Sequence, residues 1–153
     1  MTFLQAIRTG FRKYFTLSGR ASRSEFWWFQ LALFLLAIPF AVLDVLFFVS
    51  DFESEAGPLE TLYSLATVCP SLTVSVRRLH DTNKSGWYLL VPLVGGVIGI
   101  ALGAALGPSI GIAASIMAGL VIFAAFLLQL YFFIQKSDAG PNDFGPNPHE
   151  VVS

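Results

Sequence analysis

The sequence has little charge and almost no cysteine. Of its 153 residues, 12% are charged and 55% are hydrophobic, whereas about a quarter of the residues of a soluble domain are charged. Water is therefore not the main solvent of this chain. Its single cysteine, Cys69, excludes an internal disulfide, and without a second cysteine or a nearby histidine it does not indicate a metal site. We expect no cofactor and no nucleic acid partner.

Long apolar runs make up most of the chain. A helix needs about 20 apolar residues to cross the hydrocarbon core of a bilayer. Four segments meet or approach this length, which predicts an all-α integral membrane protein with a four-transmembrane-helix bundle: residues 26–49, 59–76, 87–106 and 110–134. The second segment is short and contains serine and threonine, so its alternative is a buried helix that crosses only because its neighbours do.

Basic residues are absent from the acidic segment that separates the first two runs, residues 51–57. The nine lysines and arginines precede the first run, lie between the second and third, or follow the fourth. Four spans place all nine on one side of the membrane, which is the cytoplasmic side by the positive-inside rule. We therefore expect a multi-pass protein with cytoplasmic N- and C-termini: an arm at 1–25, a membrane domain at 26–135 and a tail at 136–153.

The arm begins with a segment whose apolar residues recur at helical spacing. In residues 3–15, FLQAIRTGFRKYF, the cations fall between the apolar positions. This pattern predicts an amphipathic helix in the membrane interface with its cations facing anionic headgroups, and a partner-binding helix is the alternative. The first run is too long and too far from the start for a cleavable signal peptide. Before it, Ser22 and Glu25 fit a capping box that opens the first span.

The segment RRLHDTNKSGW, residues 77–87, concentrates charge between two apolar runs. Cations favour the last turn of a helix, Ser85 is suited to cap the next helix, and Trp87 is typical of the aromatic belt at headgroup level. The alternative is a binding site in which Arg78 holds an anion and Asp81 orients His80. Because no nucleophile or metal partner accompanies this pair, we expect no catalytic residue and no enzyme.

Two features lie inside the apolar runs. Small residues recur at every fourth position, which favours close helix packing within one chain, with a homodimer as the alternative. These positions are Gly95, Gly99, Gly103, Gly107 and Gly111. An intramembrane acid is a functional candidate, and Asp44 is such a residue, although it lies only a turn or two from the acidic segment. Pro39 on the same helix predicts a kink.

The chain resembles the YhaH-like family of small bacterial inner-membrane proteins, a domain of unknown function. The resemblance is carried by GRASRSEFWWF at 19–29, RRLHDTNKSGW at 77–87 and GPNDFGPNP at 140–148. It implies a location in the bacterial inner membrane, which is the plasma membrane. It implies no activity, substrate or cofactor.

All three motifs map to the cytoplasmic face by the charge argument, so we predict that they form one candidate cap with the Gly-Pro-Asn tail folded over the charged residues. Its members are Arg20, Arg23, Glu25, Arg78, His80, Asp81, Ser85, Gly86, Trp87, Asn142, Gly145 and Pro148. The expected function is a membrane scaffold or interaction protein whose candidate cap binds a protein partner or anionic lipid headgroups. The alternative is a small transporter or channel that uses Asp44 and the kinked first helix.

Overall fold

The computed structural model describes residues 1–48, 57–106 and 111–148. The long elements of these residues are all helices, as the sequence predicted. They are α1 (Phe3–Arg12), α2 (Arg23–Phe47), α3 (Pro58–His80), the short 3₁₀ helix η1 (Gly86–Leu90), α4 (Val91–Leu106) and α5 (Gly111–Ile134). The α3 helix continues four residues beyond the predicted end of the second span, because Arg77 and Arg78 find partners inside the fold.

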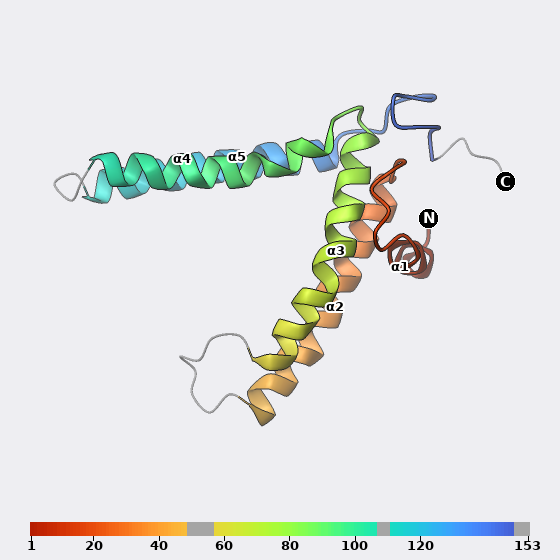
Figure 1. Ribbon diagram of the computed structural model, residues 1–153, viewed down its shortest axis with the longest axis horizontal. Coiled ribbons are helices and arrows are strands. Elements are labelled where there is room, and N and C mark those ends of the chain that lie inside the picture. Colours follow the sequence, from red (N-terminus) through yellow and green to blue (C-terminus); the bar gives the residue numbers. More distant parts are fainter. Residues whose placement is uncertain (49–56, 107–110, 149–153) are drawn as a thin grey trace.

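The four long helices form two hairpins. The α2 and α3 helices pack side by side, as do α4 and α5, and the two hairpins diverge steeply from a common end (Figure 1). Contacts between the hairpins are concentrated where α3 meets η1 and the end of α5. The arrangement differs from the single bundle that the sequence predicted.

The α4–α5 hairpin is held by the close approach of small residues. A methyl group added at Gly95 would lie 2.5 Å from the Cβ of Ala125, and one added at Gly99 would lie 3.0 Å from the carbonyl oxygen of Ala118. The glycine face of α4 is thus used against α5 within the same chain. Gly111 is the first residue of α5, whereas Gly107 lies outside the described residues.

The α2–α3 hairpin is held by polar contacts as well as by apolar packing. The amide of Gln30 donates to the hydroxyl of Ser71 at 3.2 Å, and the hydroxyl of Tyr63 donates to the carbonyl of Leu33. The two hairpins are thus held by different contacts, α2–α3 by polar and apolar groups and α4–α5 by the packing of small residues.

The α1 helix crosses the α2–α3 hairpin near its common end. It is seen almost along its axis in Figure 1, whereas α2 and α3 are seen from the side. Its buried Ala6 and Gly10 face α2, where a methyl group at Gly10 would overlap the Phe29 ring. The location of α1 in a membrane interface stays a prediction. Beside it lies a small buried core of Ala21, Phe26, Phe29, Leu33 and Val74, against which Phe133 packs.

Within the described residues, three helical segments are long and apolar enough to cross a membrane. They are Arg23–Phe47, Gly86–Ala105 and Ser115–Ile134. The α3 helix is not among them, because it ends in two arginines and a histidine and carries hydroxyl side chains along its length. The predicted count of four spans is therefore not established by length and hydropathy.

Candidate functional site

Asp81 joins three separate parts of the chain. It follows the last residue of α3, and its side chain is completely buried. Its carboxylate accepts from the Nε of Arg20 at 3.0 Å, and also from Arg78 and from the hydroxyl of Ser137. We call these four residues the Asp81 cluster. Two guanidinium groups and a hydroxyl thus compensate one carboxylate that is removed from water.

Arg20 binds the tail through backbone atoms. Its Nη1 donates to the carbonyl of Gly140 at 2.7 Å, and its Nη2 donates to the carbonyl of Asp138 at 2.7 Å. Gly140 and Gly145 have φ angles of 66° and 127°, which glycine adopts without steric cost. The turn-forming residues of the tail therefore present their carbonyls to a buried cation.

Arg78 caps the end of α5. Its Nε donates to the carbonyl of Phe133 at 3.1 Å, and its Nη2 donates to the carbonyl of Gln135. The last carbonyls of a helix have no partner within the helix, so a cation placed there satisfies them. Burial lowers the pKa of Arg78, and the charge of Asp81 opposes this effect. A guanidinium nevertheless remains protonated in a protein.

Arg77 forms a second buried ion pair, which the sequence did not assign to the site. Its Nη1 lies 2.6 Å from the carboxylate of Glu25, and both side chains are almost fully buried. The hydroxyl of Ser22 caps α2 by accepting from the backbone N–H of Glu25, but the Glu25 carboxylate turns to Arg77. Side chains at adjacent helix positions point about 100° apart. The adjacent arginines Arg77 and Arg78 could therefore have been expected to contact two different partners.

His80 holds the tail by stacking. Its ring lies parallel to that of Phe144, with 3.9 Å between the centroids, and its Nδ1 lies 3.3 Å from the carbonyl oxygen of Gly19. The side-chain amide of Asn142 donates to the backbone carbonyl of His80 at 2.9 Å. Burial lowers the pKa of His80, and the contact with Gly19 opposes it. Burial thus favours the neutral form of the imidazole.

Other members of the candidate cap lie elsewhere. Arg23 is exposed at the start of α2 and belongs to none of the three ion pairs of the described residues. Ser85 accepts from the backbone N–H of Trp87 at 3.5 Å, so these residues begin η1 and line a separate surface together with Gly86. Pro148 is the last described residue. Among the described residues, no group of three metal-ligating side chains occurs.

Asp44 caps α3 from the neighbouring helix. Its buried carboxylate accepts from the backbone N–H groups of Leu59 at 3.0 Å and Glu60 at 2.6 Å. These groups belong to the first turn of α3, where N–H groups lack partners within the helix. Gly57 makes room for the carboxylate, because a methyl group there would lie 2.2 Å from its carbon. The acid that suggested a transport pathway thus has a structural partner.

Comparison with known proteins gives a family and two named relatives. A family profile described as "Protein of unknown function (DUF805)" matches residues 14–146. The chain is 41% identical over 90 residues to "Inner membrane protein YhaI" of Escherichia coli (strain K12), covering 57% of this chain and 72% of that protein. It is 29% identical over 137 residues to "Inner membrane protein YhaH" of the same strain, covering 90% of both. No solved structure matches.

Proposed function

We propose that this chain, which belongs to the DUF805 family of proteins of unknown function, is a membrane scaffold or interaction protein of the inner membrane with four spans. Its relatives YhaI and YhaH are inner membrane proteins. In the proposed topology, residues 59–76 of α3 are the second span and both termini lie in the cytoplasm. The 23 residues of α3 correspond to a length of about 35 Å, which exceeds the hydrocarbon core.

The distribution of charge along the α2–α3 hairpin supports this topology. Asp44 and Glu60 lie at the end that is remote from the tail. Arg20, Arg77 and Arg78 lie at the end that carries the Asp81 cluster. Cations accumulate on the cytoplasmic side of membrane proteins, so the tail end is the proposed cytoplasmic end.

The interaction role rests on one observation, which is that seven of the nine lysines and arginines fall into two classes. Three arginines are buried and ion-paired inside the fold: Arg20, Arg77 and Arg78. Four other basic residues are exposed and belong to no ion pair of the described residues: Arg8, Arg12, Arg23 and Lys136. In our proposal the buried arginines join the parts of the chain, and the exposed cations meet a protein partner or anionic headgroups.

The test is native mass spectrometry on the protein gently extracted from its own membrane. We expect a stoichiometric protein or a specific anionic lipid to remain bound, and to be lost in Arg23→Gln with the fold intact. Arg23→Lys, which keeps the charge at the same position, is the matched control and should retain the bound partner. A bare monomer in the wild type would contradict the proposal, whereas a stable dimer would identify a second copy as the partner.

A small transporter or channel that uses Asp44 is the second candidate. An ion pathway generally needs a chain of ionisable groups inside the membrane, and Asp44 is already engaged with the backbone of α3. If Asp44→Asn folds normally but abolishes a cellular phenotype of the protein, transport is favoured. We also propose that the chain is not an enzyme, and an activity that is lost in His80→Ala would contradict this.

A further inference from the structure

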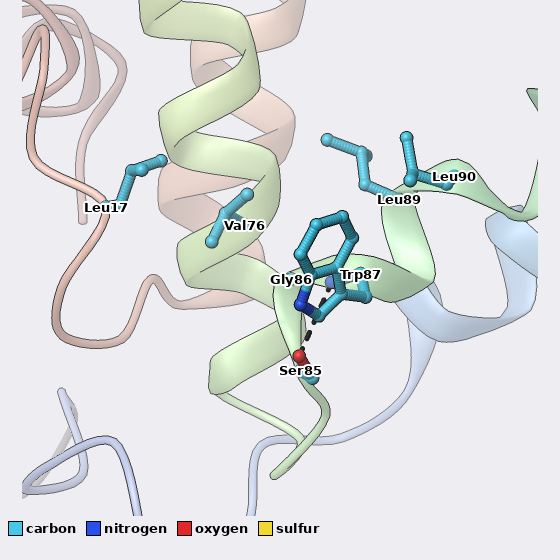
Figure 2. Close-up of a pocket in the computed structure, with 7 residues that line it drawn as sticks. All are labelled: Leu17, Val76, Ser85, Gly86, Trp87, Leu89 and Leu90. Carbon is cyan, nitrogen blue, oxygen red and sulfur yellow. Dashed lines mark hydrogen bonds between the residues drawn. The ribbon is translucent and has the colours of Figure 1, made fainter.

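An apolar groove lies where α3 meets η1. Its volume is about 310 Å³. Figure 2 shows the last turns of α3 between the N-terminal arm on one side and η1 on the other. The residues that line the groove are Leu17, Val76, Ser85, Gly86, Trp87, Leu89 and Leu90. Because all but Ser85 present apolar groups, the groove fits a hydrocarbon chain better than a polar ligand.

The groove lies at the depth where a lipid acyl chain joins its headgroup in the proposed topology. Trp87 is 78% exposed, and tryptophan side chains favour this level of the bilayer. His80 lies one helical turn beyond Val76 on the same side of α3, so the polar end of the hairpin begins directly beyond the groove. Leu89 and Leu90 lie on the η1 side of the groove, opposite Leu17 (Figure 2).

The charge around the groove is complementary to an anionic headgroup. The arm that carries Leu17 follows Arg12 and Lys13, and the backbone carbonyl of Lys13 contacts the hydroxyl of Thr73, about one turn before Val76. Neither cation belongs to an ion pair among the described residues. No carboxylate occurs among the described residues that line the groove. A basic residue near the membrane surface contributes about 1 kcal/mol to attraction of anionic lipid.

We propose that this groove binds one acyl chain of an anionic phospholipid, whose phosphate is held by the cations of the N-terminal arm. The inference rests on the proposed membrane topology and names the lipid class that the basic end of the protein selects. The apolar lining holds the chain, and Arg12 and Lys13 select the headgroup charge.

Trp87 provides a direct probe of the groove, because bromine atoms on an acyl chain quench tryptophan fluorescence only at short range. The Trp27→Phe/Trp28→Phe variant retains Trp87 alone. It would be reconstituted in vesicles that contain either brominated phosphatidylglycerol or brominated phosphatidylcholine at equal mole fraction. We expect the anionic lipid to reach Trp87 with about 30-fold higher apparent affinity, the preference that two nearby cations produce at about 1 kcal/mol each, and to lose this preference in high salt.

Three matched variants separate the groove from general attraction of anionic lipid. The Trp27→Phe/Trp87→Phe variant retains Trp28, which lies against Phe3 outside the groove, and should show a much smaller preference. In the Trp87 protein, Leu17→Asp places a negative charge at the groove and should abolish the preference. Leu17→Asn, which is polar but carries no charge at the same position, should retain it.

Three results would overturn the inference. They are equal quenching of Trp87 by the two lipids, an equal preference at Trp28, and a preference that survives Leu17→Asp. None of them would remove the scaffold proposal, which depends on a bound partner and on Arg23. Conversely, loss of the partner in Arg23→Gln with normal quenching of Trp87 would leave the groove as an independent lipid site.

Discussion

Replacing Arg78 by lysine, and separately Arg77 by lysine, tests whether the two adjacent arginines have different roles. Arg78 uses all three guanidinium nitrogens, on Asp81 and on the carbonyls of Phe133 and Gln135. Arg77 uses only Nη1, on Glu25, and its Nε and Nη2 have no partner among the described residues. Both substitutions preserve the charge, so they differ mainly in the number of hydrogen bonds that are lost.

The expected magnitudes follow from these contacts. A lysine at position 78 reaches the carboxylate but leaves two carbonyls without their donors. Each buried acceptor without a partner costs roughly 1–3 kcal/mol, so for these part-buried carbonyls we expect a loss of about 2–3 kcal/mol in the free energy of unfolding. A lysine at position 77 retains the bond to Glu25 and removes two buried donors without partners. We expect a change of less than about 1 kcal/mol there.

Equilibrium unfolding in mixed detergent micelles, followed by circular dichroism, measures both changes. Limited proteolysis of the tail is a second readout, because Arg78 acts together with Asp81, which binds the backbone of the tail. We expect faster cleavage of the tail in Arg78→Lys and an unchanged rate in Arg77→Lys. Equal losses of stability in the two variants would refute the assignment of carbonyl capping to Arg78.

Three further substitutions test the other contacts. Asp44→Asn should cost about 1–2 kcal/mol, as loss of a helix cap does, and a thermal scan in detergent that shows no change would contradict the capping role. Because burial lowers the pKa of His80, the neutral ring stabilises tail docking above about pH 6.5, and this stabilisation is lost as the pH falls. Proteolysis of the tail should therefore accelerate toward pH 5. It should not accelerate in His80→Phe, because a phenyl ring stacked on Phe144 does not titrate. Gly95→Leu should open the α4–α5 hairpin, which cysteine crosslinking measures, whereas Gly96→Leu, at a position with open space around it, should not.

Much of the fold was predictable from the sequence because hydrophobic runs and charge give strong signals. The predicted segment 110–134 matches α5 within one residue, and the charged segment 77–87 does mark a junction of the fold. The divergence of the hairpins was not predictable. The α4 and α5 helices are apolar along most of their length on every side, so their sequences only weakly specify which side faces α2 and α3.

Which residues belong to the site was easier to predict from the sequence than which atoms they contact. Arg20, Arg78 and Asp81 come together in the structure as the motifs suggested, whereas Arg23 remains exposed. Arg20 binds mainly carbonyls of the tail, and backbone acceptors of this kind leave no signature in the side-chain sequence. The Arg77–Glu25 pair depends on the relative rotation of α2 and α3, which a single sequence does not define.

Because the contacts between the hairpins are concentrated at one end, the α4–α5 hairpin can pivot as a rigid body about that end. Its contacts with the rest of the chain are concentrated at one end, beside α3 and η1. A helix of 24 residues such as α5 is about 36 Å long, so a rotation of about 5° at that end moves the far end by about 3 Å. Events at the Asp81 cluster, such as release of the tail or loss of one hydrogen bond, would therefore be magnified at the opposite end of the hairpin.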